Sequence, residues 1–291
     1  MFMIQNSIAL RMNNSIAYRF NKFVVKKNRS FRLTLNKKNF NIPLLGLVGE
    51  VNISLNENWF NKLLLFWNLP EHSDFLDIGT NVGQTLITFK SCYENIIYWG
   101  FEPNPVCVSY LETLIKANNF SNTYILPIGL SSQSSVVKFY SNSSQHTGAS
   151  INNEFRPGFY AAAEIKYVPV FVFDELDLNI NHISFIKIDV EGAELEVISG
   201  MVKTIQKHQP IIVCEVLDYH NENVQEYSQK RANQLMDCFK TLKYKAYRIL
   251  HGQNIIRYEE INSIKLKQWT NLSYERNDYL FIPNHISSLP T

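Results

Sequence analysis

One stretch, residues 75–83 with the sequence FLDIGTNVG, constrains the fold of this chain more than any other. An apolar run ends at Asp77, and Gly79 and Gly83 flank a short turn before a helical pattern. A buried parallel strand needs such a run, and a tight turn that a ligand approaches needs residues that tolerate positive φ. The first N–H groups of the next helix are free to bind a ligand there. The stretch therefore predicts a cradle for a nucleotide cofactor, or else a strand–turn–helix junction whose glycines serve packing alone.

After residue 75, apolar strand-like runs alternate with helical patterns at the spacing of right-handed βαβ units, which build a parallel sheet covered on both faces. We expect strands of this sheet at residues 76–78, 97–101, 124–128, 183–189 and 210–216. We expect helices at residues 57–69, 84–93, 105–118, 194–205 and 231–242. Other extended segments are expected at residues 136–140 and 168–173, and an antiparallel pair, 244–250 with 279–282, at the sheet edge. The chain is therefore expected to contain one α/β domain with a doubly wound sheet, residues 57–291, and a small β-rich N-terminal extension, residues 1–56.

Composition bounds the partners and the compartment. In 291 residues, 28 basic and 26 acidic side chains give a formal charge of +2, too small a field to indicate nucleic acid or an anionic membrane as a partner. The four cysteines form no C-x-x-C pair, so we expect neither zinc nor disulfides, as in a reducing compartment. The N-terminus lacks a leader pattern and no run of 18 apolar residues occurs, so we expect a cytoplasmic protein without an integral membrane segment.

A second carboxylate, Glu102, follows the expected strand 97–101 and lies 19 residues after Gly83. At this place two acceptor oxygens match the adjacent ribose hydroxyls of an adenosine, although a solvent-facing acid before a helix is the alternative. A dinucleotide would need glycines where this chain has Asn81 and Gln84, and the chain has no Walker lysine. A cofactor with ribose and adenine but no phosphate chain fits better, and S-adenosyl-L-methionine is such a molecule.

The predicted cofactor contacts come from the ends of three strands. The backbone of the first turn, together with Asp77, is expected to meet the ammonium and carboxylate groups of the cofactor. The second strand end supplies the ribose contacts, with Asn104 capping the helix that begins at Pro105. The backbone after the third strand is expected to face the adenine. The predicted set is Asp77, Gly79, Asn81, Gly83, Glu102, Asn104, Ile128, Gly129 and Leu130.

Four blocks together resemble the FkbM-type S-adenosylmethionine-dependent methyltransferases: DIGTNVG at 77–83, FEPNP at 101–105, PIGLS at 127–131 and IKIDVEGAE at 186–194. The fourth block is the most particular, and the resemblance covers roughly residues 57–250. It implies a class I methyltransferase (Rossmann-like) fold, whose seven-stranded sheet has an antiparallel last strand. It also implies methyl transfer, usually to a hydroxyl oxygen of a sugar, glycolipid or secondary metabolite, and therefore a small-molecule or glycan acceptor. Thr80 stands where alanine is more usual, a change that we expect to be tolerated.

Lys187 and Asp189 lie two apart on an expected strand, so they project to the same side near its carboxyl end. Methyl transfer to an alcohol needs an aligned oxygen nucleophile and a group that takes its proton. We expect Asp189 to act as this base or to orient the hydroxyl, held ionised by Lys187. Glu191 is the neighbouring alternative, and Glu215 is expected to contact the substrate from the same rim. The competing interpretation is a purely structural Lys187–Asp189 pair.

A metal bound by Asp189, Glu191 and Glu215 is a minority alternative, because no histidine accompanies these carboxylates, and we predict none. The polar loop 141–153 is expected to act as a lid. Its His146 is either an alternative base or a solvated loop residue.

Other readings remain for the rest of the acceptor side and for the overall function. Arg156 and Tyr160 are expected to line the acceptor site. Two further functions stay open: a non-catalytic partner protein that binds the cofactor, and an NAD-dependent oxidoreductase, which Asn81 and Gln84 disfavour.

Overall fold

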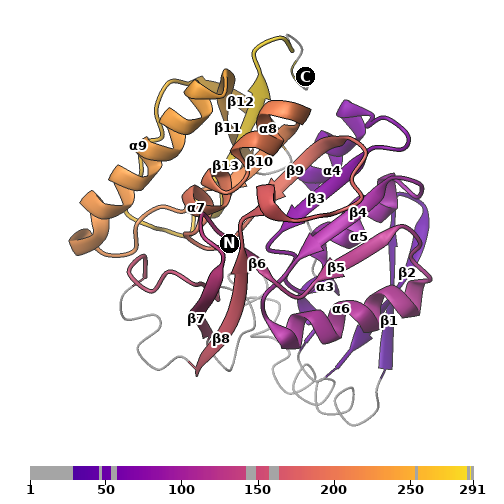
Figure 1. Ribbon diagram of the computed structural model, residues 1–291. Coiled ribbons are helices and arrows are strands. Elements are labelled where there is room, and N and C mark those ends of the chain that lie inside the picture. Colours follow the sequence, from indigo (N-terminus) through magenta and orange to yellow (C-terminus); the bar gives the residue numbers. More distant parts are fainter. Residues whose placement is uncertain are drawn as a thin grey trace, which may run out of the picture.

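The computed structural model describes residues 29–45, 48–53, 58–141, 149–156, 164–252, 255–286 and 289 (Figure 1). Within these ranges, no helix is long and apolar enough to cross a membrane. A large sheet with helices on both faces forms the body of the protein, and a smaller sheet and a hairpin are attached to it (Figure 1).

The large sheet has eight strands in the order β12-β11-β13-β10-β9-β3-β4-β5. Pairing is parallel from β5 through β10, whereas β13 runs antiparallel to both of its neighbours. This arrangement confirms the predicted class I methyltransferase fold with its antiparallel last strand, although the sheet has eight strands and not the seven that the resemblance implies. The strands are β3 (Asp74–Ile78), β4 (Ile97–Phe101), β5 (Thr123–Leu126), β9 (Ile183–Ile188), β10 (Ile211–Glu215), β11 (Tyr244–Gly252), β12 (Ile255–Ile261) and β13 (Asp278–Pro283).

The predicted antiparallel pair exists as β11 with β13, but its predicted place at the sheet edge is wrong. Strand β13 inserts between β10 and β11, and the unpredicted strand β12 forms the edge. The sequence of β12 carries Arg257, Glu259 and Glu260, and all three side chains are exposed. Charged side chains are typical of edge strands, where they discourage pairing with another chain, and they hide the strand from a search for apolar runs.

Two apolar clusters separate the helices by sheet face. Helices α4 (Asn58–Trp67), α5 (Gln84–Cys92) and α6 (Pro105–Asn118) contribute to one cluster. Helices α7 (Glu194–Ser199), α8 (Val202–His208) and α9 (Gln225–Thr241) contribute to the other. The prediction of one helix over 194–205 is therefore wrong. The carboxylate of Asp174 accepts hydrogen bonds from the N–H groups of Lys203 and Thr204, which starts a new helix after Gly200.

A second sheet of three strands follows β5. It consists of β6 (Gly129–Leu130), β8 (Glu164–Phe171) and β7 (Ser135–Ser141), with β8 in the middle. The two extended segments predicted at 136–140 and 168–173 lie in β7 and largely in β8. The described residues also contain three short 3-10 turns, namely η1 (Phe173–Glu175), η2 (Glu222–Val224) and η3 (Ser273–Glu275).

The described part of the N-terminal extension is a hairpin followed by a short helix. Strands β1 (Arg29–Leu35) and β2 (Lys38–Leu44) pair around Asn36 and Lys37, whose positive φ values of 49° and 64° suit a two-residue hairpin turn. Helix α3 (Glu50–Ile53) follows, and β2 packs against α6. The extension therefore covers the same sheet face as α4, α5 and α6.

Candidate functional site

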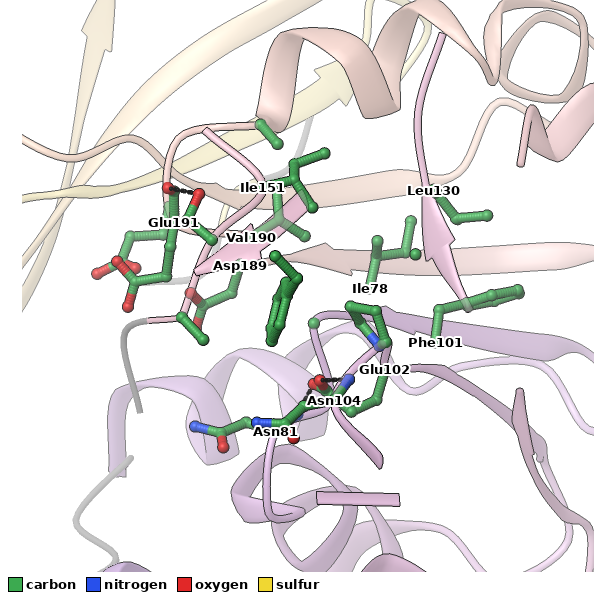
Figure 2. A pocket seen from close by; sticks show the side chains of 18 of the residues that line it. Ile78, Asn81, Phe101, Glu102, Asn104, Leu130, Ile151, Asp189, Val190 and Glu191 are labelled. Carbon is green, nitrogen blue, oxygen red and sulfur yellow. Dashed lines mark hydrogen bonds between the residues drawn. The ribbon is translucent and has the colours of Figure 1, made fainter. Parts of the chain in front are cut away.

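A cavity opens at the carboxyl ends of β3, β4, β9 and β10 (Figure 2). The chain leaves β3 toward β4 on one side, and β9 lies on the other side of β3, so this is the point where the strand order reverses. Ligands of open α/β sheets bind at such a point. The cavity has a volume of about 240 Å³. Its lining includes Gly79, Asn81, Gln84, Glu102, Asn104, Gly129, Leu130, Asp189, Glu191 and Glu215.

The glycine turn after β3 serves both the cavity and packing. Gly79 has φ +90°, and a Cβ there would lie 1.8 Å from the backbone oxygen of Asp189, so only glycine fits. Gly83 also has a positive φ, but it packs against Leu111 and Leu114 of α6 and does not line the cavity. Gly79 therefore lines the cavity and Gly83 does not, and the predicted cofactor contacts of both glycines stay predictions.

Glu102 holds the turn and α6 together from the end of β4. One carboxylate oxygen accepts the N–H of Asn81 at 2.8 Å, and the other accepts the N–H of Asn104 at 2.8 Å. Each oxygen keeps a second lone pair, which could accept a hydroxyl donor from the cavity. Burial raises the pKa of Glu102 to about 7, although these two N–H groups oppose the rise.

Asn104 caps α6 and presents an unused donor. Its side-chain oxygen accepts the N–H of Val106 at 3.1 Å, as the sequence predicts for a cap before Pro105. Its side-chain nitrogen is buried and has no hydrogen-bond partner among the described residues. Buried donors of this kind are normally satisfied, so Asn104 is suited to a ligand in the cavity that it lines.

Two predicted cofactor contacts lie away from the cavity wall. Ile128 does not line the cavity, although Gly129 and Leu130 do, because the chain turns into β6 there. The side chain of Asp77 is fully buried and accepts a hydrogen bond from the Tyr98 hydroxyl. Asp77 does not line the cavity, and its predicted contact with the cofactor ammonium stays a prediction. Asp77 follows the alternation of its strand and points with Phe75 toward the face that α5 covers.

Asp77 instead belongs to a buried polar network below the cavity. It lies directly beside Lys187 in the pairing of β3 with β9. Burial raises the pKa of Asp77 to about 6, and the charge of Lys187 and the Tyr98 hydroxyl oppose the rise. Sequence reasoning missed Tyr98, although a tyrosine in a buried strand normally needs a partner for its hydroxyl.

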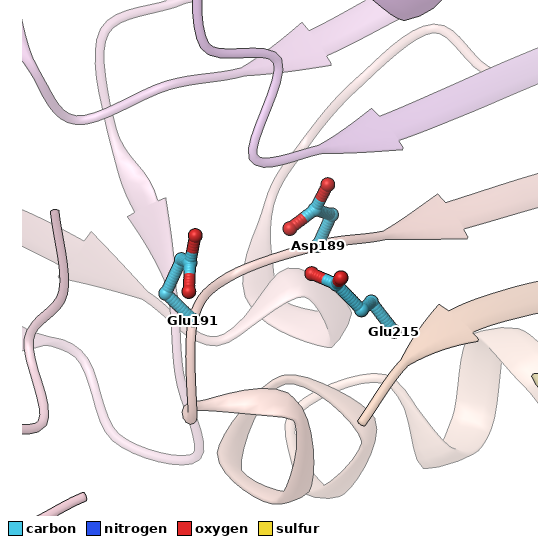
Figure 3. Close-up of side chains that lie close together, drawn as sticks. All are labelled: Asp189, Glu191 and Glu215. Carbon is cyan, nitrogen blue, oxygen red and sulfur yellow. The ribbon is translucent and has the colours of Figure 1, made fainter. Parts of the chain in front are cut away.

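The predicted catalytic residues meet at the ends of β9 and β10. Lys187 donates to Asp189 at 2.9 Å, and its side chain is only 8% exposed. Carboxylate oxygens of Asp189, Glu191 and Glu215 lie within 4.8 Å of one another (Figure 3). These three residues line the cavity, whereas Lys187 supports them from below.

The carboxyl groups of Asp189 and Glu215 have pKa values that are shifted in opposite directions. Burial alone would raise the pKa of Asp189, but Lys187 and a hydrogen bond from Glu215 lower it below its ordinary value. Burial and the neighbouring Asp189 and Glu191 raise the pKa of Glu215 well above its usual range. The lowered pKa keeps Asp189 ionised at neutral pH, and the raised pKa of Glu215 favours its protonated form.

Glu191 is held in an uncommon backbone conformation by its neighbours. Its φ is +56°, and Gly192 follows with φ +103°. Its carboxylate pairs with Arg156 at 2.9 Å, and Ser150 donates to its backbone oxygen at 2.8 Å. Positive φ in a residue other than glycine costs energy and persists only where surrounding contacts fix it. The segment 149–156 is therefore fastened onto the turn after β9.

The segment 149–156 includes part of the predicted lid. Ala149, Ser150 and Ile151 line the cavity, and the action of the loop as a lid stays a prediction. The predicted loop residues 142–148, with His146, and the predicted acceptor residue Tyr160 lie outside the described residues. Arg156 reaches the site through Glu191. Sequence reasoning missed Gln84 and Phe139 as lining residues, because helical and strand patterns do not show which side chains face a cavity.

The three carboxylates are close enough to share a divalent cation. Two of the carboxylates are already paired with positively charged side chains, since Lys187 pairs with Asp189 and Arg156 pairs with Glu191. The prediction of a metal-free site is consistent with this charge balance and stays a prediction.

Comparisons with known proteins identify the family of this chain. The model of the methyltransferase FkbM domain matches residues 77–249, which is more than half of the chain. Methyltransferase sdnD of Sordaria araneosa is 27% identical over an alignment of 161 residues, and the match covers 46% of this chain and 62% of that protein. Methyltransferase 1 of Beauveria bassiana is 26% identical over an alignment of 168 residues, and the match covers 52% of this chain and 68% of that protein.

A crystal structure of methyltransferase FkbM from Methylobacillus flagellatus aligns with 82% of this chain and 53% of that chain, at 15% identity and a TM-score of 0.43. The chain thus spans less than two thirds of the length of sdnD and about half the length of the aligned crystal structure. The family-model match does not depend on these lengths, and it sets aside the oxidoreductase alternative. The chain belongs to the FkbM methyltransferase family.

Proposed function

We propose that this methyltransferase uses S-adenosylmethionine and methylates a hydroxyl oxygen of a small-molecule or glycan acceptor. One observation carries the proposal: a single cavity is lined by groups suited to an adenosine and by a carboxylate cluster suited to a hydroxyl. The first set contains Glu102 and Asn104, and the second contains Asp189, Glu191 and Glu215. Figure 2 shows Glu102 and Asn104 together, apart from Asp189 and Glu191.

The residues on the first side fit the cofactor. Glu102 has free lone pairs for two ribose hydroxyls, and Asn104 has a buried donor that no described protein group uses. Gly129 and Leu130 bring backbone to the same wall, where adenine is expected. Gly79 and Asn81 also line the cavity, and their backbone is expected to contact the amino-acid part of the cofactor. Asp77 supports this end from below through Lys187 and Tyr98.

When bound, S-adenosylmethionine supplies an electrophilic methyl group on a sulfonium. The protein must then align the acceptor hydroxyl and receive its proton. Asp189 is ionised, lines the cavity and is therefore the proposed base. The acceptor O–H bond breaks as its proton moves to the Asp189 carboxylate.

Neighbouring groups set how Asp189 works. The Lys187 ammonium lies 2.9 Å from the Asp189 carboxylate, which keeps Asp189 ionised and fixes its orientation. Protonated Glu215 donates a hydrogen bond to Asp189 and presents its remaining oxygen to the same space. The Arg156–Glu191 pair closes the rim of the cavity and is placed to orient further hydroxyls of a polar acceptor.

Two measurements test the proposal in sequence. Calorimetric titration of the full chain with S-adenosylhomocysteine should show binding, and Glu102→Ala should weaken it. Incubation with methyl-labelled S-adenosylmethionine and cell polysaccharide, lipid and small-molecule fractions, followed by mass spectrometry, should reveal an O-methylated product. Folded protein that fails to bind the cofactor would refute the proposal.

The non-catalytic alternative makes a different prediction. It expects cofactor binding without label transfer to any fraction. The arrangement of Asp189 beside the cavity favours catalysis, because a purely structural carboxylate has no need to line a ligand-sized space. Asp189→Asn separates the two interpretations, as described in the Discussion.

A further inference from the structure

One side chain of the N-terminal extension contacts the turn at residues 79–83, which is called the cofactor turn below. Asn52, in helix α3, is fully buried. Its side-chain nitrogen donates to the backbone oxygen of Val82 at 2.7 Å and also contacts the Tyr110 hydroxyl at 3.3 Å. Val82 lies between Asn81, which lines the cavity, and Gly83. Asn52 thus connects two parts of the chain that are 30 residues apart.

The extension is held firmly enough to act as a support. The Tyr110 hydroxyl donates to the backbone oxygen of Pro43 at 3.0 Å. Gly49 has φ +96°, and a Cβ there would lie 2.3 Å from the Tyr110 hydroxyl oxygen, so this segment presses directly against α6. At the far end of α6, Asn118 accepts the N–H of Asn41 at 2.7 Å and donates to its carbonyl at 2.8 Å.

The contact between Asn52 and Val82 is important because the backbone of the turn adopts an uncommon conformation. Asn81 has φ +51°, and its N–H must point at Glu102 to make their 2.8 Å hydrogen bond. The peptide oxygen of the next residue, Val82, is fixed from the opposite side by Asn52. A buried carbonyl that loses its donor carries a penalty that favours another turn conformation.

We propose that Asn52 is a positioning residue for the cofactor turn and that the extension is a structural part of the cofactor site. Asn52 fixes the carbonyl of the peptide bond between Val82 and Gly83, one residue after Asn81, and the N–H of Asn81 orients Glu102. Helix α6, to which the extension is fastened, carries Asn104 at its start. The ligand meant here is the S-adenosylmethionine of the proposed function, so the proposal rests on that function for its affinity readout.

The test compares two buried asparagines. Asn52→Ala removes the donor to Val82. Asn61→Ala is the matched control, because Asn61 is a buried asparagine of α4 whose amide contacts Ser91 at 3.4 Å, away from the turn. For both variants we would measure unfolding in urea, the Kd of S-adenosylhomocysteine, and hydrogen exchange of the amides at 81–83.

Asn52→Ala should weaken S-adenosylhomocysteine binding about tenfold or more, as expected for one lost buried hydrogen bond. It should also accelerate exchange at 81–83. Asn61→Ala should destabilise the protein while leaving both readouts near those of the wild type. Asn52→Ser keeps a shorter donor and should lie between Asn52→Ala and the wild type, which keeps the test usable should Asn52→Ala fold poorly.

Equal effects of Asn52→Ala and Asn61→Ala on affinity and on exchange would overturn the proposal, because they would show general destabilisation only. A wild-type Kd in Asn52→Ala would overturn it as well. Should the wild-type protein fail to bind S-adenosylhomocysteine, the proposed function falls instead. The exchange comparison at 81–83 needs no cofactor and still decides the role of Asn52.

Discussion

The acidity of Glu102 predicts opposite pH dependences for folding and for cofactor binding. Burial raises its pKa from an ordinary 4.5 to about 7. Between these two values the folded protein binds a proton at Glu102 that the unfolded chain does not bind. The contribution of Glu102 to stability therefore rises as the pH falls from 8 to 6.

The magnitude follows from the two pKa values. A carboxyl with pKa 7 when folded and 4.5 when unfolded stabilises the protein by about 1.3 kcal/mol more at pH 6 than at pH 8. The ribose contact needs the ionised form, because its oxygens must accept hydroxyl donors. Cofactor binding should therefore be about tenfold weaker at pH 6 than at pH 8.

Glu102→Gln isolates this contribution from those of other buried acids. The free energy of unfolding in urea is measured at pH 6 and pH 8 for the wild type and for Glu102→Gln. The pH-dependent change should be smaller in the variant by about 1.3 kcal/mol. Calorimetry with S-adenosylhomocysteine at both pH values should show the affinity change in the wild type alone.

A wild type and a Glu102→Gln variant with the same pH dependence of stability would refute the reasoning about burial. A wild-type affinity that is equal at both pH values, or higher at pH 6, would refute the contact of ionised Glu102 with the ribose. The two failures are independent, since the first concerns the protein alone.

Three more predictions concern the rest of the site. Asp189→Asn should lower single-turnover methyl transfer by about 100-fold or more while the Kd of S-adenosylhomocysteine stays within about threefold; loss of cooperative unfolding would instead support a structural Lys187–Asp189 pair. Gly79→Ala should lower the free energy of unfolding in urea by more than about 2 kcal/mol, because its φ is +90° and the new Cβ would overlap the Asp189 oxygen; wild-type stability would contradict this packing. Dialysis against a chelator should leave turnover unchanged, because Lys187 and Arg156 already pair with the carboxylates; activity lost to the chelator and restored by Mg²⁺ would identify the cluster as a cation site.

The sequence predicted the parts of the fold that depend on local pattern. The buried strands and the start of α6 at Pro105 follow from apolar runs and from the cap at Asn104. The break between α7 and α8 was not predictable, since it depends on Asp174, which lies about 30 residues earlier in the chain. The place of β13 inside the sheet was also missed, because strand order depends on contacts distant in sequence.

The same division applies to the site. Glu102, Asn104 and Asp189 could be placed because residues that follow parallel strands gather at one edge of the sheet. The orientation of Asp77 away from the cavity also follows from strand alternation, but the expected ligand contact obscured it. The roles of Tyr98, Arg156 and Asn52 required the folded structure, because each acts through a partner remote in sequence.

The close approach of Gly79 to the backbone of Asp189 bears on how this enzyme could be re-engineered. In the proposed function, the methyl donor and the base are held at the ends of two strands that touch without an intervening side chain. A substitution that moves one will shift the other, so cofactor and acceptor specificity cannot be altered independently at residues 79 and 189. Libraries that seek new acceptors should instead vary Ala149 and Ile151, which line the cavity from a different segment.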